Sequence, residues 1–250
     1  MSFYMNSDKG NVRENNEDNF LFEKFEKLNI LILADGVGGH DNGEIASSRA
    51  VSIVMNYIKN NYKLYSEYSL LLIDAFCEAN KVIYELNLEI NSGEEEISKK
   101  VMGTTLEVLL IDGNTLYFGH VGDSRIYIKD ESFRMLTKDH SLVQYLYSSG
   151  ALTEEEVKNY NDKNSILRAI GMEKHVEVDV ESIKIKPKDI LLVCSDGLTN
   201  ELDDDEISEM IDFKYSAKEM VDNIISTVKS GLARDNVTVG IFKNDEEILC

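Results

Sequence analysis

The stretch LNILILADGVGGH, residues 28–40, joins an apolar run to an aspartate and a glycine-rich segment. Short apolar runs that end at turn residues are typical of buried strands, so a strand is expected over residues 28–34. Glycines after a strand often bind phosphate through backbone N–H groups. The carboxylate of Asp35 would repel a phosphate unless a lysine, an arginine or a metal ion came between them. The stretch therefore predicts a strand that ends at a charged site.

The composition is that of an acidic globular protein and excludes several classes of function. A net charge of -20, from 46 acidic against 26 basic residues, argues against binding to nucleic acids and to anionic membranes. No apolar stretch reaches membrane-spanning length, and the N-terminus lacks the apolar core of a signal peptide, so we expect a cytoplasmic protein. The 3 cysteines predict neither a disulfide framework nor a zinc site. Without a long linker or repeat, residues 1–250 are expected to form one domain.

Hydrophobic periodicity predicts runs of strands with helices grouped between them. Strands are expected near residues 18–24, 28–34, 105–111, 115–121, 124–129, 133–136, 176–184, 189–194 and 236–242. Helices are expected over residues 43–60, 67–91, 203–212 and 216–230, and residues 141–171 are expected to be helical and irregular. This order favours antiparallel sheets with helices on their outer faces over a doubly wound parallel sheet.

Acidic residues stand at the ends of several predicted strands. They are Glu17, Asp18, Asp35, Asp123, Asp196 and Asp235. Each one alone is better explained as a turn residue, because aspartate beside glycine or asparagine is common in turns. If the strand ends converge, however, the carboxylates would raise one another's pKa, and divalent cations would relieve the repulsion. Clustered carboxylate oxygens suit magnesium, calcium or manganese.

Other motifs in the sequence are absent or incomplete. The glycines fit neither a dinucleotide-binding motif nor a P-loop, no calcium-hand spacing occurs, and no signature supports a Ser-His-Asp triad. The sequence contains 4 histidines, at His40, His120, His140 and His175. They are scattered, so each is expected to have a structural or surface role, and only His40 lies beside the Asp35 loop.

Eight blocks, taken in order, resemble the metal-dependent protein phosphatases, the PPM or protein phosphatase 2C family. The blocks are SDKGNVRENNEDN (7–19), ADGVGGHDNGEIAS (34–47), GTTL (103–106), GHVGDSRIY (119–127), LTKDHSLV (136–143), LRAIG (167–171), LLVCSDGLTN (191–200) and DNVTVGIF (235–242). Each block alone is weakly specific, but the ordered set spans nearly the whole chain. The resemblance is strongest to the compact bacterial serine/threonine phosphatases that act opposite PASTA-type kinases.

The resemblance implies an α+β fold, a four-layer α-β-β-α sandwich of two antiparallel sheets flanked by helices. It also implies two ions of manganese or magnesium at one end of the sandwich. Carried onto this chain, Asp35 would bridge both ions, and Asp196 and Asp235 would complete the first site. Glu17 and the carbonyl of Gly36 would serve the second site.

Further site residues follow from the same resemblance. Asp18 would hold metal-bound waters. Asp123 and Asp196 would bind a third, weaker ion. Residues 140–170 would form a flap beside the site.

Two positions bear on substrate binding and proton transfer. Arg13 matches the arginine that grips the substrate phosphate, and the alternative is a surface ion pair with Glu14 or Glu17. Val37 stands where many eukaryotic members have a histidine proposed as the general acid. A metal-bound water is therefore the first candidate for this acid, and His40 is the second.

The resemblance implies a protein serine/threonine phosphatase in which a metal-bridging water or hydroxide attacks the phosphate. Phosphorylated proteins would be the substrates, a serine/threonine kinase would be the counterpart, and the protein would be a monomer. Three alternatives stay open: a catalytically inactive relative that binds phosphoproteins, a phosphatase for small molecules, and an acidic calcium-binding structural protein. The presence of every expected metal ligand argues against the inactive relative.

Overall fold

Two antiparallel sheets lie at the centre of the computed structural model, which describes residues 2–38, 42–92, 101–158, 160 and 165–245. Across the first sheet the strands are β1 (Ser2–Asp8), β11 (Val237–Lys243), β10 (Ile190–Cys194), β7 (Arg125–Lys129) and β8 (Phe133–Met135). Across the second they are β2 (Asp18–Phe25), β3 (Leu28–Val37), β5 (Leu106–Asp112), β6 (Thr115–Val121) and β9 (Asp179–Lys184). The short strand β4 (Gly103–Thr104) pairs with β3.

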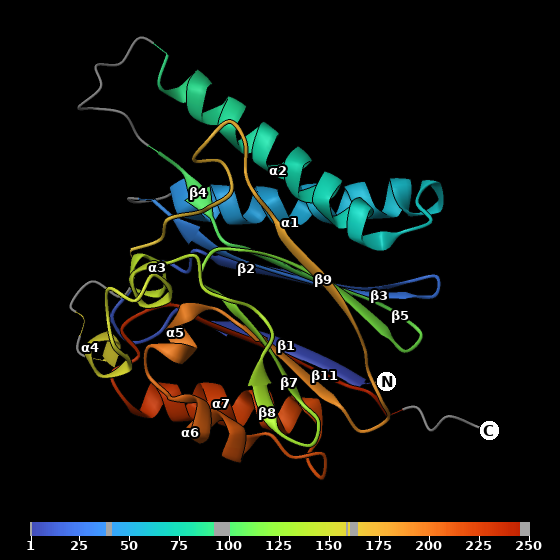
Figure 1. Ribbon diagram of the computed structural model, residues 1–250, viewed down its shortest axis with the longest axis vertical. Coiled ribbons are helices and arrows are strands. Elements are labelled where there is room, and N and C mark those ends of the chain that lie inside the picture. Colours follow the sequence, from blue (N-terminus) through green and yellow to red (C-terminus); the bar gives the residue numbers. More distant parts are fainter. Residues whose placement is uncertain (1, 39–41, 93–100, 159, 161–164, 246–250) are drawn as a thin grey trace.

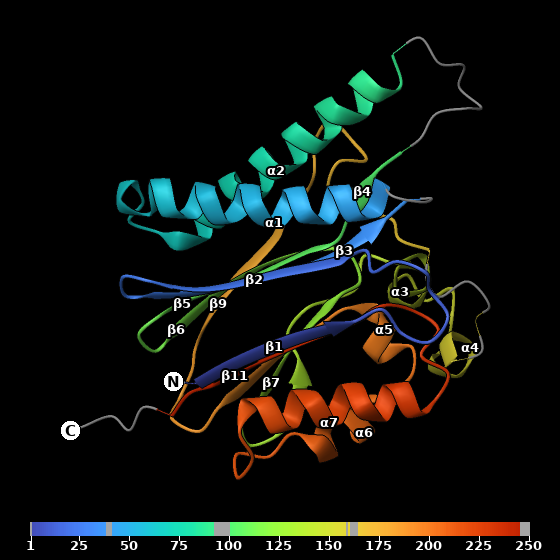
Figure 2. The ribbon, with the colours of Figure 1, turned by 180° about the vertical axis from the view of Figure 1, so that it is seen from behind.

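Helices cover the outer face of each sheet (Figures 1 and 2). The second sheet is covered by α1 (Asn42–Asn61) and α2 (Tyr68–Ile90), which the 3-10 turn η1 (Tyr62–Leu64) joins. The first sheet is covered by α5 (Asp196–Thr199), α6 (Asp204–Met210) and α7 (Ala217–Ser230), while α3 (Leu142–Ser148) and α4 (Glu154–Lys158) lie at the same end of the sandwich as α5 and β4. The predicted four-layer α-β-β-α sandwich is confirmed.

Strand β3 is buried on both faces, which explains its continuous apolar sequence. Ile30 and Ile32 pack toward α1 and α2, whereas Leu31 and Leu33 pack between the two sheets. Because successive side chains of a strand point to opposite faces, an inner strand of a four-layer fold is favoured by apolar residues on both of its faces. The apolar run at residues 28–34 therefore places β3 at the centre of the second sheet.

The predicted end of this strand is wrong. β3 does not stop at residue 34 but continues through Asp35 to Val37. Gly36 and Val37 pair with Thr104 and Gly103 of β4, and these backbone contacts prolong the strand. Asp35 and Gly36 are therefore held in a sheet rather than in a turn.

Four elements have no counterpart among the predictions, namely β1, η1, β4 and α5, and β9 begins later than expected. β1 is an edge strand that pairs only with β11, and its mixed sequence SFYMNSD shows no clear alternation. The four-residue helix α5 is too short to produce helical periodicity. β9 begins at Asp179 rather than at residue 176.

Helix α7 illustrates how some of the acidic residues serve the fold. Its N-terminus carries a capping box, in which Ser216 accepts a hydrogen bond from the backbone N–H of Glu219 and the Glu219 side chain accepts one from Ser216. Asp203 and Glu206 form the same box on α6.

No helix in the described ranges is long and apolar enough to cross a bilayer.

Candidate metal centre

Five aspartates from both sheets meet at one end of the sandwich. Asp18 opens β2 and lies directly opposite Asp35 on β3. Asp123 follows β6, Asp196 begins α5 directly after β10, and Asp235 shortly precedes β11. Burial raises the pKa of Asp35 well above its ordinary value, and the charges of the other four carboxylates raise it further. The antiparallel arrangement of both sheets thus assembles the cluster that the strand ends predicted.

Three other members of the cluster also resist ionisation. The pKa rises to about 6 for Asp18 and for Asp196, and to about 8 for Asp123. Burial is the largest cause in each case, and neighbouring carboxylates add to it: Asp235 for the first two, and Asp196 for Asp123. A site in which several neighbouring carboxylates are harder to ionise than usual has an electrostatic environment that favours a cation.

Two buried carboxylate oxygens in the cluster have no hydrogen-bond partner among the residues that the structure describes. Asp18 Oδ2 accepts hydrogen bonds from Ser195 Oγ at 2.7 Å and Thr238 Oγ1 at 2.6 Å, but its Oδ1 has none. Asp123 Oδ1 is likewise buried without a partner. Buried, unpartnered carboxylate oxygens are costly, and hard divalent cations are their natural partners.

The side chains alone do not enclose an ion. Among the described residues, no three carboxylate, imidazole or thiolate groups lie close enough together to hold a metal by themselves. Mg²⁺ and similar ions usually keep several waters and also accept backbone oxygens as ligands. The donor set therefore fits a hydrated divalent ion better than a fully dehydrated one.

Gly36 and Glu17 lie beside each other because the backbones of β3 and α1 approach closely. A Cβ at position 36 would lie 2.3 Å from the carbonyl oxygen of Gly43, so only glycine fits. The Gly36 N–H donates to the Glu17 carbonyl at 3.2 Å, and Ser47 Oγ donates to the same carbonyl at 2.6 Å. These contacts bring together the two residues expected to serve the second ion.

Arg13 lies on the connection between β1 and β2, within reach of the cluster. Its Nη2 donates to Asp235 Oδ2 at 2.7 Å, and the side chain is 51% exposed. The hydrogen bond to Asp235 raises the pKa of Arg13, and the charges of Glu17 and Asp35 add to this effect. The arginine thus stands at the open edge of the cluster, paired with one of its carboxylates.

Asn236 is a site residue that the sequence reasoning missed. Its Oδ1 accepts from the Glu17 N–H at 2.8 Å, and its Nδ2 donates to the carbonyls of Lys9 and Asn15 at 3.0 and 2.9 Å. It thereby ties the connection that carries Arg13 to the start of β11. The DNVTVGIF block contained this residue, but spacing alone could not show what its amide would contact.

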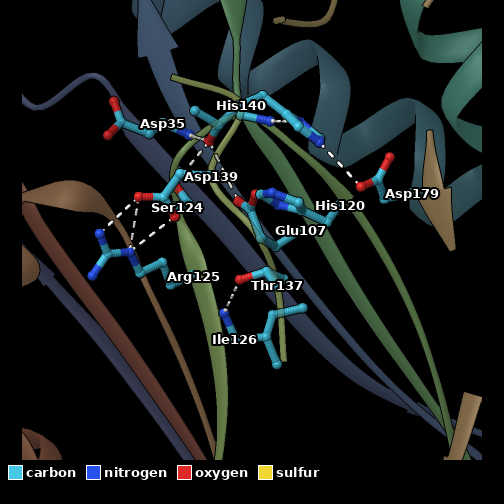
Figure 3. A network of polar contacts seen from close by, with 12 residues as sticks. Asp35, Glu107, His120, Ser124, Arg125, Ile126, Thr137, Asp139, His140 and Asp179 are labelled. Atoms are coloured by element: carbon cyan, nitrogen blue, oxygen red, sulfur yellow. Dashed lines mark hydrogen bonds and ion pairs between the residues drawn. The ribbon is translucent and has the colours of Figure 1, made fainter. Parts of the chain in front are cut away.

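A buried polar network supports Asp35 from behind (Figure 3). The Asp35 N–H donates to Thr105 Oγ1 at 3.0 Å. The same hydroxyl lies 2.9 Å from Ser124 Oγ and donates to Glu107 Oε2 at 3.3 Å. Thr105 belongs to the GTTL block, to which the sequence reasoning assigned no role.

Some expected features fall outside the described residues. His40, the second candidate for the general acid, is one of them, as are residues 159 and 161–164 of the expected flap. Val37 is described and ends β3.

Comparison with known proteins decides the family. A model of the family described as protein phosphatase 2C matches residues 10–232. The chain belongs to the protein phosphatase 2C family. One curated relative is a serine/threonine phosphatase named Stp from Listeria innocua, which is 38% identical to this chain over 236 residues. The match covers 93% of this chain and 92% of the relative.

Solved structures extend the match to three dimensions. The S. agalactiae serine/threonine phosphatase superposes with a TM-score of 0.85 at 32% identity, covering 97% of this chain and 99% of its own. The catalytic domain of the serine/threonine protein phosphatase PstP, in complex with two manganese ions, gives a TM-score of 0.79 at 32% identity over 96% of each chain. This member of the protein phosphatase 2C family is a protein serine/threonine phosphatase, and the predicted family and enzyme class are confirmed.

Proposed function

We propose that this phosphatase hydrolyses phosphoserine and phosphothreonine in proteins with two manganese or magnesium ions, and that it opposes a serine/threonine kinase. The observation that carries the proposal is the cluster of five aspartates, in which buried oxygens of Asp18 and Asp123 lack partners. The two manganese ions in the similar PstP catalytic domain support the same chemistry. An acidic chain can accept a phosphate once bound cations reverse the local field.

The ligands follow from the positions of the side chains. Asp35 would hold both ions, because the charges of the other aspartates act on it from both sheets. Asp196 and Asp235 would complete the first site. Glu17 and the carbonyl of Gly36 would serve the second, and the contact of the two residues supports this pairing.

The remaining two aspartates would have supporting roles. Asp18 would orient water bound to the ions. Ser195 and Thr238 donate hydrogen bonds to its Oδ2 and thereby fix the carboxylate, so that its Oδ1 is left to accept a hydrogen bond from such a water. Asp123, with Asp196, would bind a third and weaker ion. The unpartnered Oδ1 of Asp123 and its raised pKa support this role.

The chemistry divides between the ions and the chain. When bound, the two ions would neutralise the phosphate and lower the pKa of water, so that hydroxide is available near neutral pH. Arg13 would bind phosphate oxygens with its planar N–H donors. Because its guanidinium is half exposed, it can exchange Asp235 for the substrate phosphate with little rearrangement of the fold.

Phosphate release from a phosphothreonine peptide tests the proposal. Chelated protein is compared with protein given manganese, magnesium or calcium, and Asp35→Asn serves as the control. Turnover with manganese or magnesium, lost in the variant, is expected. Tight metal binding without turnover would favour the inactive relative, whereas calcium-dependent stability without turnover would favour the structural protein. Turnover of small phosphate esters but not of phosphopeptides would favour the small-molecule phosphatase.

Several sequence predictions belong to the same proposal. They are a single catalytic domain over residues 1–250, a flap over about residues 140–170, a monomeric state and a cytoplasmic location. Each stays a prediction. The proposed opposition to a kinase is tested by asking whether this phosphatase removes the phosphate that a candidate kinase adds to its protein substrates.

A further inference from the structure

The expected flap leaves the sandwich through two short paired segments, residues 140–142 and 165–167, called the flap root below. Backbone hydrogen bonds join the segments, including one of 2.7 Å from the Leu167 N–H to the carbonyl oxygen of His140. An isolated antiparallel bridge adds to this pairing. The flap root is therefore a fixed feature of the fold, and His140 lies within it.

His140 makes two reciprocal hydrogen bonds with Gly122, the residue before Asp123. The backbone N–H of His140 donates to the Gly122 carbonyl at 2.7 Å, and the Gly122 N–H donates to His140 Nδ1 at 3.1 Å. Gly122 has a φ of +126°, and a Cβ there would lie 2.6 Å from the side chain of Thr105. The turn that presents Asp123 is thus enclosed between Thr105 on one side and His140 on the other.

Polar contacts at both nitrogens determine the orientation of the His140 ring. Nδ1 accepts the Gly122 N–H at 3.1 Å, so this nitrogen carries no proton. Nε2 lies 3.2 Å from Asp179 Oδ2 and 2.9 Å from Arg168 Nη1. Arg168, next to the flap root, donates to Asp179 Oδ1 at 2.8 Å. Burial lowers the pKa of His140 to about 4, in agreement with a neutral ring. Asp179 and Arg168 therefore hold the imidazole in the orientation that Gly122 requires.

A second buried histidine supports the first (Figure 3). The rings of His120 and His140 stack with their centroids 4.6 Å apart. His120 Nδ1 lies 3.0 Å from Glu107 Oε1, with both side chains almost fully buried, and its Nε2–H donates to the Lys138 carbonyl at 3.1 Å. Glu107 also accepts the Thr105 hydroxyl, so the stack is joined to the network behind Asp35.

We propose that His140 is a positioning residue, which holds the Gly122–Asp123 turn and thereby couples the flap root to the orientation of the Asp123 carboxylate. The inference rests on the role proposed above for Asp123. A side chain that only filled space would need neither an acceptor at Nδ1 nor polar partners at Nε2. His140 has both, and the partners belong to the turn before Asp123 on one side and to β9 and Arg168 on the other.

Three variants separate positioning from packing. His140→Leu removes both ring nitrogens but keeps a buried apolar side chain. In His140→Asn, the amide oxygen can take the place of Nδ1 and accept the Gly122 N–H. His175→Asn is the matched control, because His175 is exposed and lies outside this network.

The first readout is amide hydrogen exchange, which does not depend on activity. In His140→Leu we expect exchange in peptides covering residues 119–124 to accelerate roughly tenfold or more, since the hydrogen bond that protects Gly122 is lost. His140→Asn should restore most of the protection. The control should leave exchange unchanged.

The second readout is the effect on catalysis and ion binding. In His140→Leu we expect kcat to fall roughly tenfold with little change in KM for a phosphopeptide, because the side chain would act on Asp123 and not on the bound substrate. Calorimetry with manganese should show two tight sites retained and the third weakened by about tenfold. His140→Asn should recover part of the kcat and part of the affinity of the third site.

The outcomes distinguish this inference from the proposed function. Normal kcat in Asp123→Asn would refute the role of Asp123 itself. A different result would overturn only the positioning role of His140. In that case Asp123→Asn would be impaired, whereas a folded His140→Leu protein would keep its kcat and its amide exchange at residues 119–124. If His140→Leu does not fold, Asp179→Ala takes its place, since it removes the carboxylate that contacts both His140 Nε2 and Arg168. Faster exchange at residues 119–124 in that variant is expected, and unchanged exchange would overturn the inference.

Discussion

Asp18 and Asp35 lie directly opposite each other on the paired strands β2 and β3. Like charges at opposite positions of an antiparallel pair destabilise a sheet, and burial raises the pKa of both carboxyls. The strand register therefore brings together two groups that repel each other unless a cation lies between them. Without a cation, the repulsion between the two carboxylates destabilises the fold, so their pairing suits an ion-binding site.

Chelation should make the stability of the protein depend on pH above neutrality. Burial and the charge of Asp196 raise the pKa of Asp123 to about 8, so at pH 6.5 the folded state holds a proton that the unfolded state has lost. The free energy of unfolding must then fall as pH rises from 6.5 to 8.5. At about 1.4 kcal/mol per pH unit and group, the Tm should drop by roughly 5 °C or more. Saturating manganese should abolish this slope, and calorimetric scans with a flat Tm in chelator would contradict the prediction.

Asp35→Asn should separate activity from stability. The variant loses the carboxylate expected to hold both ions, so kcat should fall by roughly a hundredfold or more. Without metal, its Tm should rise by a few degrees, because a like charge opposite Asp18 is removed. Asp205→Asn on the exposed surface of α6 is the control and should change neither quantity. Near-normal turnover by the folded Asp35→Asn protein would refute the assignment.

Arg13→Ala should act mainly on substrate binding. The guanidinium is half exposed at the edge of the cluster and would meet the phosphate in the ground state as well as in the transition state. We expect KM for a phosphopeptide to rise about tenfold with a much smaller change in kcat. Steady-state kinetics measures both, with Arg49→Ala, on the exposed side of α1, as the control. An unchanged KM would count against Arg13.

Asn236→Ala should loosen the connection that carries Arg13 and Glu17. The substitution leaves one backbone N–H and two carbonyls without their partner, at a cost of roughly 2–3 kcal/mol, or about 5–10 °C in Tm. Asn236→Asp keeps the acceptor for the Glu17 N–H and should lose less stability. Thermal unfolding of the two variants tests the ranking. Equal stability of Asn236→Ala and the unaltered protein would show that the amide does not hold this connection.

Local sequence patterns were sufficient for the main elements of the fold. The apolar run at residues 28–34 and the amphipathic stretches that became α1 and α2 depend on the alternation of buried and exposed faces, which each segment encodes within itself. β1 was missed because it forms by pairing with β11, a strand more than two hundred residues away in the sequence, and not through a pattern of its own. The extension of β3 to Val37 depends in the same way on pairing with β4.

The sequence by itself determined which residue types stand at the strand ends, and the ordered blocks around them indicated the family. Only the tertiary structure decided that carboxylates from two different sheets converge, that Asp18 and Asp123 each have an oxygen without a partner, and that Asn236 and His140 hold the surrounding turns. The physical reason is that burial, repulsion and hydrogen bonding depend on distances between segments. Those distances exist only once both sheets have packed together.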